Sequence, residues 1–321
     1  GVRSAAIESG IRYANRLDLV LFELAEKTKT AGVFTLNAFC AAPVTVARRH
    51  IAAMSPRYLL INTGNANAGT GVQGERDAIA CCEAVARECG VNAEQVLPFS
   101  TGVIGELLPV DKIVSALPAA HKALAVDQIA AAARGIMTTD TRPKMVSRQV
   151  MVEGHQVTIS GIAKGSGMIK PNMATMLGYV ATDAPIDEEL LHAALQKANG
   201  KSFNRITVDG DTSTNDAVML VATGSSGVQI DEANFELFLE WIKKNPELVP
   251  VICKGLSKLM IVDIALDREH DNPQLIFESM NSTGKALSQA DLIRNFILMG
   301  LKPDLQTDLY KGYWRPIEME F

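Results

Sequence analysis

The alternation of apolar and polar residues over the first two thirds of the chain predicts short strands separated by helices. Runs of strand length that are rich in apolar and β-branched residues occupy residues 17–24, 58–63, 156–160 and 216–224. Residues 75–90 and 188–200 instead repeat apolar positions at helical spacing, and each ends in glycine, a common stop at a helix C-terminus. Strands that alternate with helices predict an α/β architecture of layered sheets and helices.

The pattern changes near residue 230. Residues 1–230 hold 20 of the 24 glycines, whereas residues 231–321 hold 4 and carry both tryptophans. The Gly- and Ser-rich stretch 222–234 is a candidate linker between the two regions. Helical spacing returns in the second region, at residues 234–245, 247–259 and 288–301. We therefore expect an α/β region over residues 1–227 and a mostly helical segment over residues 228–321.

Composition narrows the classes of function. A chain of 321 residues with 47% hydrophobic and 21% charged residues is typical of a soluble globular protein. A net charge of −5 disfavours general nucleic-acid binding. No apolar run reaches the roughly 18 residues of a membrane span, and the start lacks a signal-peptide pattern. An odd set of five cysteines without a CxxC pair disfavours a disulfide framework and a zinc site, which predicts a cytoplasmic protein.

Two motifs resemble ligand sites only superficially. Gly69-x-Gly71-x-x-Gly74 stands too far behind its strand for a dinucleotide fingerprint, so it predicts a glycine-rich turn. The stretch Asp209–Asp216 has oxygen ligands at alternate positions but lacks the closing glutamate of a calcium loop. The five histidines show no ligand spacing. We therefore expect no metal site and no cofactor.

A third stretch carries more chemistry. The sequence predicts a glycine-rich polar loop over residues 161–167, which leads through Pro171 to Ala174-Thr175 and then into an apolar run. A threonine hydroxyl in such a flexible backbone can attack the preceding carbonyl and release the upstream chain. The new N-terminal amine has an unperturbed pKa of about 7.7 and can deprotonate its own hydroxyl. Pattern alone does not distinguish Thr175 from other threonines.

Resemblance makes that distinction. Residues 164–177, KGSGMIKPNMATML, resemble the self-cleavage segment of the ornithine acetyltransferases, also called bifunctional glutamate N-acetyltransferases. Further family-like strings follow the family order at residues 31–44, 62–71, 98–106, 135–144 and 204–216. The resemblance extends over residues 1 to about 227. It implies layered sheets and helices of the DmpA-like type.

The resemblance also implies roles for single residues. The chain would cut itself between Ala174 and Thr175, and Thr175 would be the nucleophile that carries the acetyl group. Thr101 and Gly102 match the family's oxyanion-hole pair, a side-chain hydroxyl and a backbone N–H. Such donors are expected to stabilise the oxyanion by about 3 kcal/mol each.

Substrate binding is implied at Thr138, Lys164 and Thr175. The implied reaction is a ping-pong transfer, in which N-acetylornithine acetylates Thr175 and glutamate then takes the acetyl group, in arginine biosynthesis. Some family members also accept acetyl-CoA as the donor. The acyl-enzyme carries the group, so no cofactor is implied. The α and β chains would form a heterotetramer.

The last part of the chain resembles a different family. Residues 264–301 and 309–321 are similar to the later part of the DUF262 domain of GmrSD-type, nucleotide-dependent restriction proteins. The turn Asn281–Gly284 before a capped helix suits either a phosphate or an ordinary N-cap. The downstream substrate-binding residues of the acetyltransferases have no match that we find. Two alternatives therefore stay open: an inactive chimeric chain, and a nucleotide-binding interaction or defence module.

Overall fold

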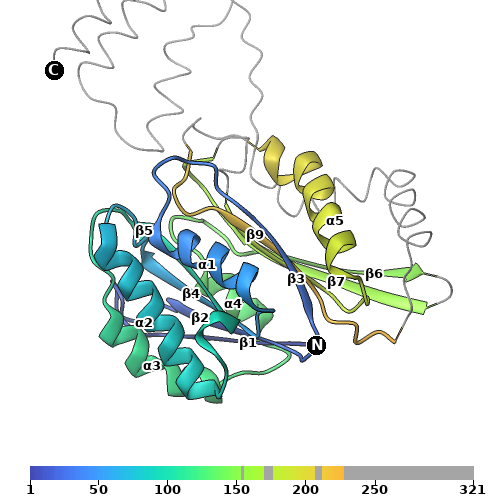
Figure 1. The fold of residues 1–321 in the computed structure, drawn as a ribbon, viewed down its shortest axis with the longest axis horizontal. Coiled ribbons are helices and arrows are strands. Elements are labelled where there is room, and N and C mark those ends of the chain that lie inside the picture. The colour runs from blue at the N-terminus through green and yellow to red at the C-terminus, as the bar shows by residue number, and fades with distance from the viewer. Residues whose placement is uncertain (153–154, 170–175, 207–211, 228–321) are drawn as a thin grey trace, which may run out of the picture. The chain divides into compact units, whose positions relative to one another are not determined.

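The computed structural model describes residues 1–152, 155–169, 176–206 and 212–227, all within the compact unit Gly1–Ile261 (Figure 1). Ala174, Thr175, the predicted helical segment 228–321 and the Asn281–Gly284 turn lie outside these residues. Among the residues that are described, no helix combines the length and apolar character needed to cross a bilayer.

The first sheet has the strand order β1-β2-β4-β5. Its strands are β1 (Val2–Ile7), β2 (Leu19–Leu24), β4 (Tyr58–Asn65) and β5 (Val96–Val103). β4 and β5 are parallel, which requires a long crossover, and α2 (Gly71–Cys89) with the short helix η1 (Ala93–Gln95) supplies it. α2 and α3 (Val110–Lys122) cover the outer face of this sheet (Figure 1).

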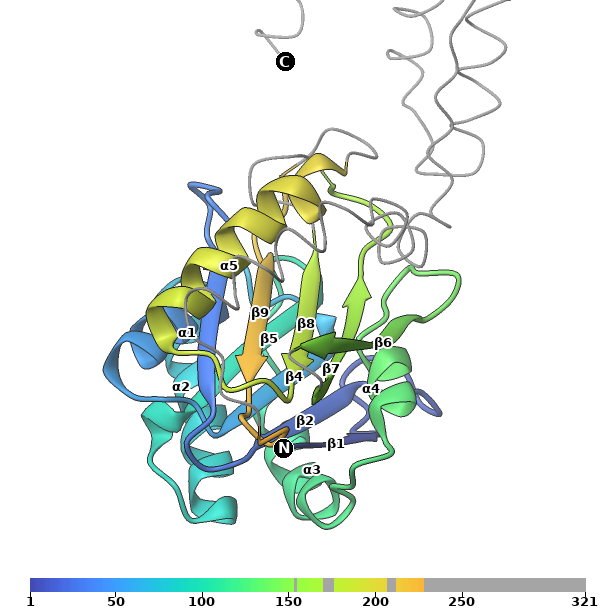
Figure 2. The ribbon, with the colours of Figure 1, turned by 90° about the vertical axis from the view of Figure 1, so that its right-hand side faces the viewer.

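The second sheet has the order β3-β9-β8-β7-β6. Its strands are β3 (Lys29–Phe34), β6 (Lys144–Val152), β7 (His155–Lys164), β8 (Leu177–Thr182) and β9 (Ala217–Ala222). α5 (Glu188–Lys201) and the short helix η2 (Phe203–Arg205) connect the parallel strands β8 and β9, and α5 covers the outer face (Figure 2). α1 (Ala42–Ala53) packs beside β5, and α4 (Ile129–Gly135) contacts strands of both sheets.

Successive residues of β2 are buried on opposite faces of the first sheet, because this sheet lies between its covering helices and the second sheet. Leu19 and Leu21 of β2 join the core under α2 and α3, whereas Val20 and Phe22 join the core between the two sheets. Because both faces are covered, the strand reads as a nearly continuous apolar run. The four layers are therefore helices, sheet, sheet and helix, which confirms the predicted α/β layering.

Aromatic side chains connect the two sheets at the centre of this core. The ring of Tyr179 on β8 lies 5.7 Å from Phe22 and 5.3 Å from Phe99, measured between ring centroids. The contact with Phe99 is edge-to-face, a geometry that adds to the apolar burial.

Most predicted elements are confirmed, with corrected boundaries. The predicted glycine-rich loop over residues 161–167 is wrong in its first half, because β7 continues to Lys164. Both neighbouring strands hold this part in register, with Gly161 opposite Val146 and Val180. α2 begins at Gly71 rather than at residue 75.

The predicted glycine-rich turn is confirmed, and two of the cysteines pack in the core. Cys81 and Cys82 are buried on α2, and burial raises the pKa of Cys81 to about 12, which keeps its thiol protonated. Gly69 and Gly71 take φ values of 70° and 59° in the turn between β4 and α2. The Asn67 side chain closes that turn by donating to the carbonyl of Gly74 at 2.8 Å.

Ile61 offers a test of the core between the sheets, because its side chain is 0% exposed. Ile61→Ala is expected to lower the free energy of unfolding by about 2–5 kcal/mol, since the cavity cannot collapse between two paired sheets. Val72→Ala, at a position that is 69% exposed, is the control and should change it by less than about 0.5 kcal/mol. Urea denaturation measures both, and equal midpoints would contradict the layered packing.

Candidate active site

The predicted oxyanion pair lies where β5 ends beside β4. Thr101 pairs with Thr63 and Gly102 with Gly64, after which the register shifts at a bulge. Gly102 has a φ of 141°, and a Cβ there would lie 2.3 Å from the Gly64 carbonyl carbon. Only glycine fits so close to the neighbouring backbone. Thr101 is 9% exposed, so its hydroxyl is held in a mostly dry environment.

Lys164 reaches this pair from the other sheet. Its Nζ donates to Thr101 Oγ1 at 2.9 Å. An ammonium group has no acceptor, so Thr101 Oγ1 must accept this bond and its own hydrogen can point elsewhere. Burial lowers the pKa of Lys164, although the charges of Asp140 and Asp216 oppose that shift. The arrangement leaves a hydroxyl donor fixed beside a cation, as an oxyanion site requires.

Asp140 builds the turn that carries Thr138. Its carboxylate accepts the backbone N–H of Thr138 at 3.2 Å and that of Gly165 at 2.8 Å, and it forms an ion pair with Lys144. Burial alone would raise the pKa of Asp140, but the bonds from Lys144 and Gly165 outweigh it, so the pKa lies below its ordinary value. The carboxylate therefore fixes the Thr138 turn against the residue that follows Lys164.

Arg16 secures the same turn from the first sheet's side. Its guanidinium donates to the carbonyl oxygens of Met137 and Thr138, each at 2.8 Å. It also contributes to the lowered pKa of Lys164, which indicates that two positive charges share this edge of the molecule. Such an edge suits a substrate that carries a carboxylate.

Asn215 links the second sheet to the first, and Asp216 follows it. The Asn215 amide donates to the carbonyls of Ala66 at 2.6 Å and Ser100 at 2.9 Å. Asp216 is 4% exposed, and burial raises its pKa to about 7 against the effects of Ser213 and Lys164. Sequence reasoning missed Asp216 because it treated the acids of 209–216 together. The available signal was an aspartate placed directly before a fully apolar strand.

The structure thus brings the described candidates together at one edge. Thr101 contacts Lys164 directly, Gly102 follows Thr101, and Thr138 is connected through Asp140 to Gly165. Ala174 and Thr175 lie outside the described residues. The chain after them is fixed, because Leu177 at the start of β8 pairs with Lys164.

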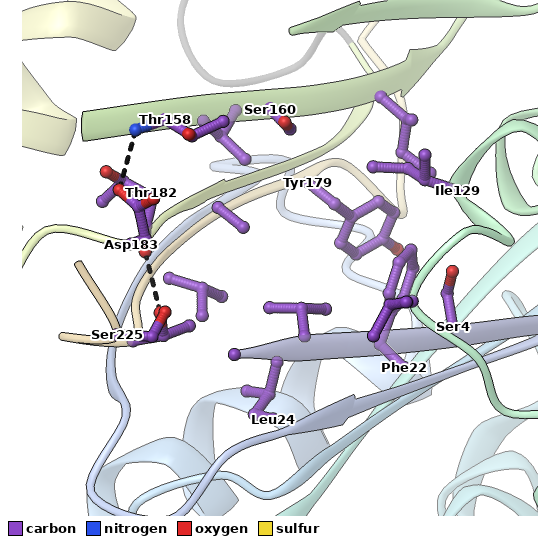
Figure 3. Close-up of a pocket in the computed structure, with 18 of the residues that line it drawn as sticks. Ser4, Phe22, Leu24, Ile129, Thr158, Ser160, Tyr179, Thr182, Asp183 and Ser225 are labelled. Atoms are coloured by element: carbon purple, nitrogen blue, oxygen red, sulfur yellow. Dashed lines mark hydrogen bonds between the residues drawn. The ribbon is translucent and has the colours of Figure 1, made fainter. Parts of the chain in front are cut away.

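A separate pocket of about 330 Å³ lies between the sheets (Figure 3). Tyr179, Thr182 and Asp183 line it, and the Thr158 N–H donates to the Asp183 carboxylate at 2.7 Å. Strand residues of both sheets line it, and none of the candidate site residues does. The pocket is therefore distinct from the candidate active site.

Comparison with known proteins identifies close relatives. The ArgJ family matches residues 3–264. The arginine biosynthesis bifunctional protein ArgJ of Methylococcus capsulatus is 48% identical over 301 residues, which cover 92% of this chain and 72% of that protein. The protein of the same name from Pseudomonas syringae pv. tomato is 56% identical over 264 residues, which cover 82% of this chain and 63% of that protein.

A solved structure gives a third relative. Ornithine acetyltransferase from Mycobacterium tuberculosis, in complex with ornithine, is 33% identical, with 54% of this chain and 93% of that chain covered and a TM-score of 0.48. The family match continues to residue 264, past residue 227 where the motifs read from the sequence end. The assignment of residues 228–321 to a separate domain stays a prediction.

Asp140→Asn tests the turn that holds Thr138. The variant leaves Lys144 without its buried partner, so the free energy of unfolding at pH 7 should fall by about 3–5 kcal/mol. The folded-state pKa of Asp140 is lowered from 3.8, so its stabilisation is complete above that pH and is lost as the pH falls through the folded value. The difference from the wild type should therefore shrink below about pH 4. Thermal unfolding measures it, and the exposed Asp127→Asn is the control.

Proposed function

This chain belongs to the ArgJ family, and we propose that it transfers the acetyl group of N-acetylornithine to glutamate through a threonine nucleophile. The family is one of acetyl-transfer enzymes in arginine biosynthesis. The observation that carries the proposal is the hydrogen bond of 2.9 Å between Lys164 and Thr101. It joins two sequence motifs, 63 residues apart, and Lys164 pairs with Leu177, the first residue of the strand that follows the predicted nucleophile.

Self-cleavage would create the nucleophile. In this proposal Thr175 Oγ attacks the carbonyl carbon of Ala174, the C–N bond breaks, and water hydrolyses the resulting ester. The products are residues 1–174 and 175–321, the second with a threonine at its N-terminus. The support is the sequence motif and the anchoring of the next residue, since the Ala217 N–H donates to the Met176 carbonyl at 3.1 Å.

Acetyl transfer would then use the geometry at the end of β5. The Thr175 amine takes the hydroxyl proton, and Oγ bonds to the acetyl carbon of N-acetylornithine. The Thr101 hydroxyl and the Gly102 N–H stabilise the oxyanion. Because Lys164 occupies the acceptor side of Thr101 Oγ1, the hydroxyl is set to donate before the substrate arrives. Ornithine leaves, and the glutamate amine attacks the acetyl-threonine.

Positive charge and a fixed turn would hold the substrate. Lys164 and Arg16 provide the cations for a carboxylate, and Thr138 provides a hydroxyl on the turn that Asp140 holds. Neither half-reaction needs a metal or an organic cofactor, since the threonine carries the acetyl group. We further propose acetyl-CoA as a possible second donor, and an assembly of α and β chains as a heterotetramer, both from family membership.

Thr175→Ala tests self-processing in the full chain. The wild type is expected to give two bands on denaturing electrophoresis, and the variant one intact band, because the alanine has no hydroxyl to attack. Mass spectrometry of the wild type incubated with N-acetylornithine should show one added acetyl group on the fragment that begins at Thr175. An intact wild-type band would contradict cleavage, and an unmodified fragment would contradict the acyl-enzyme.

Thr101→Val tests the oxyanion hole. Valine keeps the shape of threonine but removes the donor, so kcat for acetyl transfer should fall by about 10²–10³-fold. Thr101→Ser is the matched control, because serine retains the hydroxyl that Lys164 orients, and its kcat should stay within about tenfold of the wild type. A steady-state assay of acetylglutamate formation measures both. Equal rates in the valine variant and the wild type would remove Thr101 from the mechanism.

A further inference from the structure

Two ionisable residues approach the start of β8 from opposite sides. β8 lies between β7 and β9 (Figure 2). Leu177 pairs with Lys164 on β7 and with Ala217 on β9, and Asp216 directly precedes Ala217. Thr175 stands two residues before Leu177 in the sequence. The strand that begins after the predicted nucleophile is therefore flanked by a lysine and an aspartate.

The Asp216 carboxyl is buried and only partly satisfied. The Ser213 hydroxyl hydrogen-bonds to it, but its Oδ2 is enclosed and has no hydrogen-bond partner among the residues that the structure describes. Leaving a buried polar atom without a partner destabilises a fold by about 1–3 kcal/mol. Asp18, another buried carboxyl, is satisfied instead by bonds from Ser9 and Ile11. Within the part of the chain that the structure describes, Oδ2 therefore has hydrogen-bonding capacity that the fold does not use.

The charges around Asp216 come from several elements. The charge of Lys164 on β7 lowers the pKa of Asp216, and the pKa of Lys164 in turn responds to Asp140, Lys144 and Arg16. Arg48 of α1 donates to the Thr35 carbonyl at 2.5 Å, and the Thr35 N–H donates to the backbone carbonyl of Asp216. Burial outweighs the Ser213 hydrogen bond and the Lys164 charge, and it raises the pKa of Asp216 to about 7.

We infer that Asp216 is the proton-exchanging carboxyl of this site, and that it serves the amine that loses or gains the acetyl group. The inference rests on the proposed acetyl transfer. Asp216 exchanges the proton of the substrate nitrogen, whereas the Thr175 amine exchanges the proton of the Thr175 hydroxyl. The free Oδ2 is the atom that gives and takes this proton.

The proton balance closes over the two half-reactions. When Thr175 Oγ bonds to the acetyl carbon, the C–N bond of N-acetylornithine breaks and the protonated Asp216 gives its proton to the departing nitrogen. The Thr175 amine keeps the proton that it took from the hydroxyl, so the first half-reaction ends with an Asp216 carboxylate and a Thr175 ammonium. In the second half-reaction the Asp216 carboxylate accepts the proton that the glutamate amine loses as it attacks, while the threonine amine returns one to Oγ. A group that is half protonated near neutral pH can work in both directions.

The raised pKa of Asp216 makes the stability of the fold depend on pH. Its folded-state pKa is about 7, above the ordinary value of 3.8, so the folded chain holds this proton more tightly than the unfolded chain. The contribution of Asp216 to stability is therefore greatest below pH 3.8 and decreases as the pH rises through about 7. Above that pH the folded chain holds a buried charge. An uncharged isostere should then stabilise the fold while it disables the reaction.

The test compares three variants of the full chain with the wild type, each assayed for acetyl transfer per cleaved molecule across pH. Asp216→Asn is expected to lower kcat by at least about 10²-fold and to abolish the ionisation near pH 7 in the kcat/KM profile. Its Tm at pH 8 should equal or exceed that of the wild type. Ser213→Ala removes the hydrogen bond that favours the carboxylate, so it should shift this ionisation to higher pH. Asp183→Ala, which removes the acceptor of the Thr158 N–H, is the control and should lower Tm without moving the profile.

The outcomes separate the inference from the proposed function. A wild type that transfers no acetyl group overturns the proposed function before any variant is compared. A wild type that is active, with an Asp216→Asn variant of unchanged kcat and pH profile, overturns the inference alone. A Tm of Asp216→Asn well below the wild type at pH 8 assigns a structural role and also overturns it. Should that variant fail to fold, an unmoved profile in Ser213→Ala overturns the inference.

Discussion

The face-to-face packing of two sheets is the constraint on which the rest of the structure depends. Phe22, Phe99 and Tyr179 hold the inner faces together, and the helices on the outer faces leave each sheet little freedom to slide. With the layers fixed, the end of β5 in one sheet must stand opposite the end of β7 in the other. The bond between Thr101 and Lys164 follows from that alignment. A rigid apolar interior thereby positions polar groups that no single strand could bring together.

Electrostatics at this edge work in a poorly hydrated setting. Asp140 carries a lowered pKa because hydrogen bonds from Lys144 and Gly165 outweigh its burial, whereas burial raises the pKa of Asp216. Asp140 and Asp216 carry the same chemical group in different surroundings. Asp140 holds a turn, whereas Asp216 can change its charge near neutral pH. The charges of Asp140 and Asp216 both raise the pKa of Lys164, so the interaction of Lys164 with Thr101 depends on the charge state of these carboxyls.

The layered α/β architecture could be predicted from the sequence because burial on one or two faces leaves a periodic trace. β2, β4 and α5 were predicted close to their observed bounds for this reason. The extension of β7 to Lys164 could not, since Gly161 breaks the apolar pattern and only pairing with β6 and β8 keeps the strand extended. Thr101, Gly102, Thr138 and Lys164 were identified by resemblance. Asp140, Arg16 and Asp216 were missed, because their importance lies in contacts between distant segments that one-dimensional spacing does not encode.

The strand order β3-β9-β8-β7-β6 has a further consequence for a chain that cuts itself before β8. The upstream fragment would own β3, β6 and β7, while β8 and β9 would belong to the downstream fragment and sit between β3 and β7. Each fragment would therefore complete the hydrogen-bond ladder of the other along two strand boundaries. Severing the peptide would leave an interlocked, non-covalent heterodimer that comes apart only by unfolding. Such a protein would gain a free terminus without losing a strand from either sheet.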